Sequence, residues 1–276
     1  MKSLKILINI IVLTIISAQE IPNSFSELIL RSIYLDLGEN WVNNSIFGPT
    51  RWQQYSSFNP KTDSLYFYSK IGLNIKKINA SQSKSIYAHS NFVFNKNFYG
   101  YSYSRIVSNI DAYQGYSGLQ QDIERFGFNS GETDLSGLGF ENDWLMLQFG
   151  RGRQDWSAGD NIGLIISSES PSYDYGILGI SFDHIRLRYF HGFLENVNLN
   201  NRYITGRGIE FTNKSNFIFG LSEIVIYSGV NRPVDFSYLN PMLTHLEIEL
   251  NDRQNKLNTD SGNAVWQASM DFMVNS

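Results

Sequence analysis

The stretch Leu178–Tyr189, LGISFDHIRLRY, reads as two short strands joined by a tight turn. A two-residue turn at Asp183 and His184 sets the register of the two strands. That register gathers six apolar side chains on one face, as the pairs Phe182–Ile185, Ile180–Leu187 and Leu178–Tyr189. It gathers small residues and arginines on the other face, as the pairs Ser181–Arg186 and Gly179–Arg188. The stretch therefore predicts an antiparallel hairpin with one apolar and one polar face.

The same period of two residues recurs along the chain from residue 64 onward. A second hairpin is predicted to turn at residues 213–215, with Phe211 opposite Phe217 and Ile209 opposite Phe219. The alternation predicts strands near residues 64–76, 84–94, 98–107, 133–140, 143–150, 174–182, 185–193, 204–212, 216–227 and 263–274. Strands of this length with alternating faces are typical of transmembrane β-barrels. We therefore expect an all-β fold, a transmembrane antiparallel β-barrel or part of one with about ten strands.

The predicted connectors alternate in length. Short turns are expected near residues 95–97, 141–142, 183–184 and 213–215, and longer connectors near 77–83, 108–132, 151–173, 194–203 and 228–262. Outer-membrane barrels have short periplasmic turns and longer extracellular loops. The alternation favours a barrel with its long connectors on the outer side.

Composition narrows the class of protein. The 276-residue chain is 14% aromatic and only 17% charged, which is ordinary for an outer-membrane barrel. It has no cysteine, which excludes disulfides and cysteine-bound metal, and its net charge of −4 does not suggest nucleic-acid binding. Lys2 and Lys5 followed by the apolar run Ile6–Ile16 and by Ser17-Ala18 indicate a secretory signal. We expect a signal peptide at 1–18, an N-terminal segment at 19–63, a barrel portion at 64–276, and location in the outer membrane.

Two Gly-Arg-Gly runs stand at strand ends. Arg151 and Arg153 continue the parity of the apolar residues before them, so they lie at the membrane interface or, if the flanking glycines shift the phase, in the lumen. Arg207 stands in a similar run on a later strand. The apolar parity of the next strand breaks at Glu223, which predicts a bulge there and places Glu223 diagonally from Arg207, within reach of an ion pair.

The outer rim thus collects arginines, carboxylates, tyrosines and Trp156. Aromatic faces stack on sugars and arginines bind carboxylates in bidentate fashion, so this inventory suits a sugar polymer. The alternative is a structural network that fills the barrel interior. There is no nucleophile-elbow serine motif, no HExxH motif and no Walker A motif, and the four histidines have no metal-ligand spacing. Glu210 and Glu223 are the one carboxylate pair to consider for glycoside hydrolysis, and the sequence leaves their relative faces open. We predict no catalytic residue, metal or cofactor.

Four segments resemble the Wzi-type capsule-assembly family of outer-membrane proteins. They are LQFGRGRQDWSAG (147–159), NRYITGRGIEF (201–211), GLSEIVIYSG (220–229) and DFSYLNP (235–241). Members of that family are longer, with further strands after the Asn-Pro loop, so we expect this sequence to be truncated at its C-terminus.

The resemblance implies a lectin-like protein, not an enzyme, that organises capsular or exopolysaccharide at the cell surface. The residues it implies are Arg151, Arg153, Trp156, Arg207, Glu210, Glu223, Tyr227, Asp235 and Tyr238. Expected partners are the polysaccharide, outer-membrane lipid and, during biogenesis, the barrel-assembly machinery; nucleic acid is not expected. The alternatives are a passive porin-like channel with an arginine-lined lumen and a secreted carbohydrate-active β-protein.

Overall fold

The computed structural model describes residues 65–78, 81–95, 97–113, 115–154, 156, 166, 170–250 and 262–272. The expected signal peptide and the N-terminal segment lie outside these residues. The described chain forms one ten-stranded antiparallel sheet in which each strand pairs with the next in sequence. Its strands are β1 (Leu65–Ile78), β2 (Ser81–Phe94), β3 (Phe98–Val107), β4 (Ser130–Glu141), β5 (Leu145–Gly152), β6 (Tyr173–Phe182), β7 (Ile185–Val197), β8 (Asn200–Thr212), β9 (Phe217–Val230) and β10 (Asn263–Phe272).

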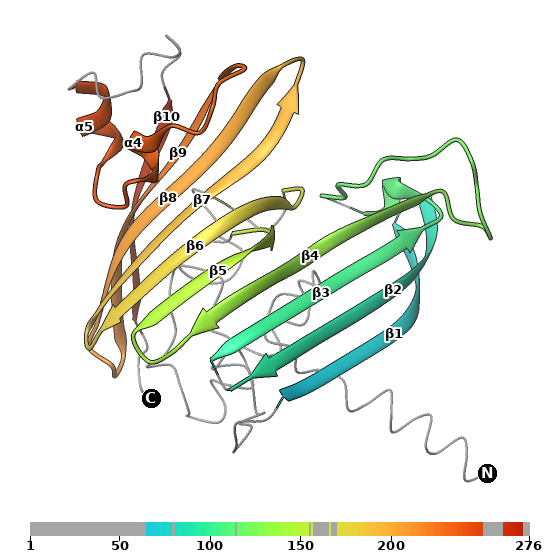
Figure 1. Cartoon of the computed structure of the whole chain (residues 1–276), viewed down its shortest axis with the longest axis horizontal. Helices are drawn as coiled ribbons and strands as arrows, with labels where there is room; N and C mark the ends of the chain where they lie inside the picture. The colour runs from blue at the N-terminus through green and yellow to red at the C-terminus, as the bar shows by residue number, and fades with distance from the viewer. Residues whose placement is uncertain are drawn as a thin grey trace.

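The all-β prediction is confirmed, and ten predicted strands correspond to ten observed ones. The sheet is curved but open, with β1 and β10 as its two edges (Figure 1). The described parts of the connectors contain three short helical turns: η2 (Ile110–Ala112), α4 (Phe236–Leu239) and α5 (His245–Leu250). No helix among the described residues is long and apolar enough to cross a membrane.

The first hairpin has the predicted register, with Phe182 opposite Ile185 and Leu178 opposite Tyr189. The second hairpin is displaced by two residues, since Phe211 pairs with Phe219 and not with Phe217. The cause is a longer turn, in which the Asn213 side-chain oxygen accepts hydrogen bonds from the backbone N–H groups of residues 215, 216 and 217. A shift of two residues leaves each side chain on its predicted face.

The predicted lengths of two connectors are wrong, because both are short turns. β7 and β8 are joined by Asn198 and Leu199 alone, and only residues 79–80 separate β1 from β2. Asn198 and Leu199 both have positive φ, as a two-residue hairpin turn requires. The strands continue past the apolar stretch because polar cross-strand pairs such as Glu195 with Arg202 extend the ladder. The remaining long connectors, 108–129, 153–172 and 231–262, leave the same end of the sheet, opposite the four short turns.

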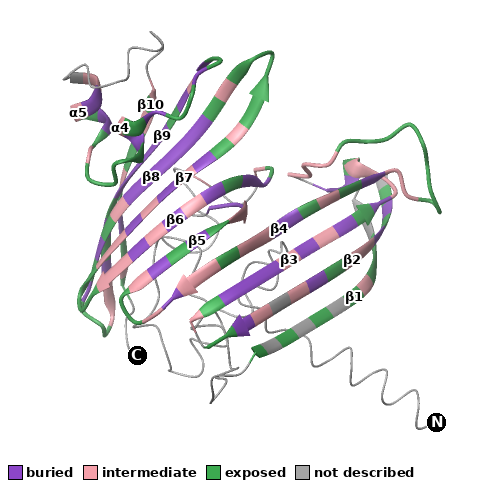
Figure 2. Ribbon diagram, viewed as in Figure 1, coloured by how far each residue is buried: buried purple, intermediate pink, exposed green. Residues whose placement is uncertain are grey.

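The two faces of the sheet differ in chemistry. We call the face that carries Leu138, Phe149 and Ile209 the outward face, and the face that carries Tyr99, Gln148 and Glu210 the inward face. Large apolar side chains on the outward face are exposed, for example Phe149 at 71% and Leu138 at 62%. The alternation appears as bands of buried and exposed residues along the strands in Figure 2.

The inward face is polar and aromatic, and it is packed. Gln148 accepts a hydrogen bond from the Tyr99 hydroxyl at 2.7 Å and donates to the hydroxyls of Tyr101 and Tyr175 at 3.0 Å each. Aromatic rings lie flat over glycines, so that a Cβ placed at Gly206 would lie 2.2 Å from the Phe190 ring. Burying Gln148 and these three tyrosines is stable because their polar groups are hydrogen-bonded to one another. The sheet therefore hides its polar face and exposes its apolar one.

Candidate functional site

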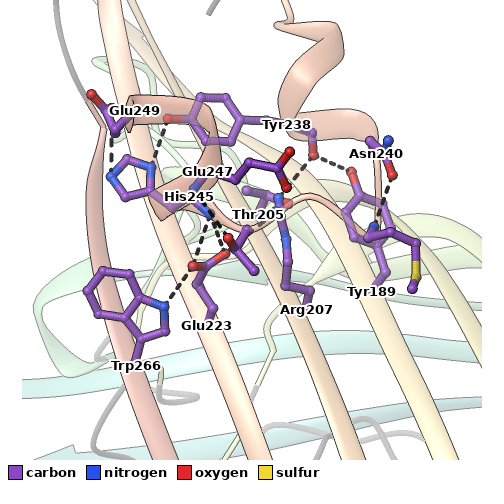
Figure 3. A network of polar contacts seen from close by, with 12 residues as sticks. Tyr189, Thr205, Arg207, Glu223, Tyr238, Asn240, His245, Glu247, Glu249 and Trp266 are labelled. Carbon is purple, nitrogen blue, oxygen red and sulfur yellow. Dashed lines mark hydrogen bonds and ion pairs between the residues drawn. The ribbon is translucent and has the colours of Figure 1, made fainter. Parts of the chain in front are cut away.

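A polar cluster crosses four strands on the outward face near the end that carries the long connectors. Cross-strand pairing places Tyr189, Arg207, Glu223 and Trp266 in one row over β7, β8, β9 and β10. The α4–α5 connector lies over this row, as Figure 3 shows, and adds Tyr238 and His245. We call these six residues the rim cluster.

Glu223 is the acceptor at the centre of the rim cluster. Both of its carboxylate oxygens accept from the His245 backbone N–H at 3.0 Å, and Oε1 also accepts from the indole Nε1 of Trp266 at 2.7 Å. Arg207 Nη1 lies 3.5 Å from Oε2. Glu223 thus joins β8, β9 and β10 to the start of α5, and it sets the orientation of the Trp266 ring.

Tyr238 holds the connector against the strands. Its backbone carbonyl accepts from the Tyr189 hydroxyl at 2.9 Å and from Arg207 Nη2 at 3.4 Å. Its own hydroxyl shares a hydrogen bond of 2.9 Å with His245 Nδ1. Burial, aided by the charge of Glu249, raises the pKa of the Tyr238 phenol. The hydroxyl therefore stays protonated at physiological pH.

Arg207 is buried with incomplete compensation. Only 7% of the residue is exposed, and its Nε has no hydrogen-bond partner among the described residues. The Glu223 carboxylate is already engaged by the backbone and by an indole, so the guanidinium approaches it only at ion-pair distance. A buried donor without an acceptor is costly, which marks Arg207 as the least satisfied group of the rim cluster.

An aromatic stack continues the rim cluster toward the end of the strands. The rings of Tyr203 and Tyr227 stack at 5.0 Å, and those of Tyr227 and Tyr238 stack at 4.5 Å. Arg232 lies 4.9 Å from the Tyr227 ring centroid, and its Nη2 lies 3.5 Å from the Asp235 carboxylate. Asp235 also caps α4 by accepting from the Ser237 backbone N–H at 2.9 Å. Tyr227, Asp235 and Tyr238 are therefore parts of one buried support.

A second charged cluster lies on the inward face. Arg153 Nη2 lies 2.7 Å from Asp134, Arg105 lies 3.7 Å from Asp134, and Arg105 Nε donates to Glu132 at 2.6 Å. We call these four residues the inward ion cluster. Two cations and two anions compensate one another here, and the rings of Tyr113 and Tyr116 flank Arg105 at 4.8 and 5.3 Å. Buried charges persist when they are paired in this way.

The nine residues singled out from the sequence fall into separate places. Arg207, Glu223, Tyr227, Asp235 and Tyr238 come together around the α4–α5 connector. Arg153 joins the inward ion cluster, and Trp156 packs on the inward face against Phe190 with ring centroids 5.1 Å apart. Glu210 pairs with Arg186 at 2.7 Å on the inward face, whereas Arg151 pairs with Asp174 at 2.9 Å on the outward face. All except Arg151 are buried.

The bulge predicted near Glu223 is wrong. Pairing runs without a shift along β8, β9 and β10, and Glu223 lies directly opposite Arg207, not diagonally from it. The apolar parity changes there because the α4–α5 connector covers the outward face, so polar side chains are buried on it, while Ile224 packs inward beside Phe190. The same register places Glu210 and Glu223 on opposite faces, so they do not form a carboxylate pair.

Sequence reasoning missed several members of both clusters. His245 and Tyr189 reach the rim cluster only through the fold of the connector. Trp266 lies in the strand predicted at 263–274, where the alternation gives it no special role. Glu132 and Asp134 were also missed, since Glu132 lies just before the predicted strand at 133–140 and the spacing of the two carboxylates gives no sign of burial. A register shift between Tyr103 and Ser104 turns Asp134 inward beside Leu135.

Comparisons of the chain with protein-family models, with curated proteins and with solved structures find no match.

Proposed function

We propose that this chain forms part of an outer-membrane β-barrel that binds polysaccharide at the cell surface. The observation that carries the membrane part is the inversion of the two sheet faces. A soluble sheet protein buries its apolar face, whereas here that face is exposed over most of its area and the tyrosine- and arginine-bearing face is buried. An exposed apolar patch of this extent indicates a membrane or a partner, and the alternation matches lipid outside and polar groups inside.

The surface part of the proposal rests on Trp266. Its ring is 57% exposed, and its Nε1 is held by Glu223, so an apolar face is presented in a fixed orientation. Phe236 on α4 is also exposed, at 76%. A fixed, half-exposed aromatic ring is the usual platform for the apolar face of a sugar, since it loses little entropy on binding. Arg207, Glu223 and Tyr238 then act as the support that positions this ring.

Two measurements test the proposal. Cell fractionation should place the protein in the outer membrane, and recovery in the soluble fraction would refute the membrane part. The purified protein should retain a labelled polysaccharide, with alginate as a polyuronate probe and dextran as a neutral one. Trp266→Ala should weaken binding about threefold to tenfold through lost stacking.

Controls separate stacking from support. Trp266→Phe keeps a ring but lacks the indole donor that fixes its orientation, so it should lose part of the affinity and less than Trp266→Ala loses. Trp144→Ala removes a ring that is 50% exposed at the opposite end of the sheet and should leave binding unchanged. Equal losses in the Trp144 and Trp266 variants would exclude a binding role for Trp266.

The porin-like alternative rests on the inward face. Arg186 and Arg188 both lie on that face of β7, and a charged channel lining would require such residues. Single-channel recording in a planar bilayer tests it. Steady ion conductance without polysaccharide retention would favour the channel over the lectin.

A further inference from the structure

The connector between β3 and β4 ends in an apolar tip. Three of its large side chains are exposed: Leu119 at 78%, Ile123 at 66% and Phe126 at 100%. The stretch from residue 119 to residue 127 is exposed throughout, and in Figure 2 the connector extends away from the sheet. Single exposed apolar residues are normal, but three within eight positions of one projecting connector require an explanation.

The backbone at the tip is unusual for the residue it carries. Arg125 and Phe128 exchange backbone hydrogen bonds of 2.8 and 3.0 Å, which closes a two-residue hairpin turn. The central residues, Phe126 and Gly127, have φ of 55° and 83°. Asn, Asp or Gly usually occupies the first of these positions, because a bulky side chain at positive φ is strained. A strained phenylalanine that is fully exposed points to a function for its ring.

The base of the connector is held firmly. Ser117 donates from its backbone N–H and its hydroxyl to Glu132 of the inward ion cluster at 2.7 and 2.8 Å. The Ser130 hydroxyl donates to the Leu119 carbonyl at 2.8 Å, and Gln121 N–H donates to the Asn129 carbonyl at 2.7 Å. The apolar tip is thus projected from an ordered base.

The connector also begins where the outward apolar face ends. Cross-strand pairing aligns Leu73, Ile86 and Ile106 in one outward row, and Ile106 pairs with Gly131 at the start of β4. Leu73 and Ile106 are exposed. The hydrogen bond from the Ser130 hydroxyl to the Leu119 carbonyl therefore holds the tip to β4 one residue beyond this apolar row.

We infer that Leu119, Ile123 and Phe126 form an interfacial anchor that inserts into the outer leaflet of the bilayer surrounding the barrel. The inference rests on the proposed membrane location. The tip carries Asp122, Glu124 and Arg125, a net charge of −1, so apolar contact rather than attraction to anionic headgroups drives insertion. Aromatic residues at the membrane interface serve as such anchors in barrels.

The absence of cysteine from the chain allows single-site labelling. Three variants, Phe126→Cys, Phe149→Cys and Ser215→Cys, are labelled with a nitroxide and reconstituted as the full chain in phosphatidylcholine vesicles. Phe149 lies on the outward face, and Ser215 is exposed in a turn at the opposite end of the sheet. Collision rates with oxygen and with a water-soluble nickel chelate report the depth of each label.

The label at residue 126 should show a several-fold higher ratio of oxygen to nickel accessibility than the label at residue 215. If residue 149 lies in lipid but residue 126 is as accessible to nickel as residue 215, the anchor is refuted and the membrane proposal stands. If residue 149 is also in water, the membrane proposal itself fails.

A second variant guards against a change of turn shape. Phe126→Asn suits positive φ and preserves the turn, so a label at Ile123→Cys in that background should move toward water, and an unchanged depth would also overturn the inference.

Discussion

Asp134→Asn tests the inward ion cluster. Asp134 is fully buried, and it lies 2.7 Å from Arg153 and 3.7 Å from Arg105. Removing one partner of a buried ion pair costs about 3–5 kcal/mol. The remaining contacts limit the loss, since Arg105 keeps Glu132 and Arg153 still donates to the Gly115 carbonyl at 3.0 Å. We therefore expect the free energy of unfolding to fall by about 3 kcal/mol, near the lower end of that range.

Asp174→Asn is the matched control. Asp174 pairs with Arg151, which lies in β5 two residues before Arg153, and the Asp174 side chain is 64% exposed. Exposed pairs contribute roughly 0–1 kcal/mol, so this change should be nearly neutral. Both variants and the parent are compared by urea titration in lipid vesicles, followed by tryptophan fluorescence. Equal midpoint shifts for the two variants would refute the assignment of a buried, stabilising ion pair to Asp134.

Three further changes address the remaining features. Gly206→Ala places a Cβ 2.2 Å from the Phe190 ring and should destabilise the fold by about 1–3 kcal/mol in the same titration. In the double variant with Phe190→Ala, the loss of unfolding free energy should differ from the sum of the two single losses. A loss equal to that sum would contradict the contact between Gly206 and Phe190. Glu223→Gln replaces the carboxylate that accepts the His245 N–H with a neutral amide, which is a weaker acceptor. Hydrogen exchange of the His245 amide should therefore accelerate roughly tenfold or more, and an unaltered rate would show that Glu223 does not hold the start of α5. Asn213→Ala removes the acceptor of three backbone N–H groups and should lower stability by about 1–2 kcal/mol, whereas Asn213→Asp should not.

Much of the sheet could be predicted from the sequence, because the alternation of side chains along a strand depends only on neighbouring residues. The stretch Leu178–Tyr189 predicted its own register, which is observed, since only one pairing puts its apolar groups together. Connector lengths were harder to predict, as shown by the two-residue turn between Val197 and Asn200. Polar residues there extend a ladder in water, and no hydrophobic pattern marks where such a strand ends.

The candidate site was accessible only in part. The ion pair between Arg207 and Glu223 was foreseen, although from a bulge that is not present. The burial of this ion pair and its neighbours were not predicted, because Tyr238 and His245 belong to a connector, and residue periodicity does not predict the path of a connector. The role of Trp266 was not predictable either, because its hydrogen bond to Glu223 depends on the pairing of β9 with β10.

The sequence by itself determined that the chain forms antiparallel strands with one apolar and one polar face, because side chains alternate across a strand whatever surrounds it. Tertiary structure decided which of those side chains are covered. Arg151 and Arg153 are two residues apart, yet the Arg151 side chain is 33% exposed beside Asp174 and Arg153 is buried beside Asp134. The strand ends between them at Gly152, and beyond that point direction depends on contacts with distant residues that local spacing does not encode.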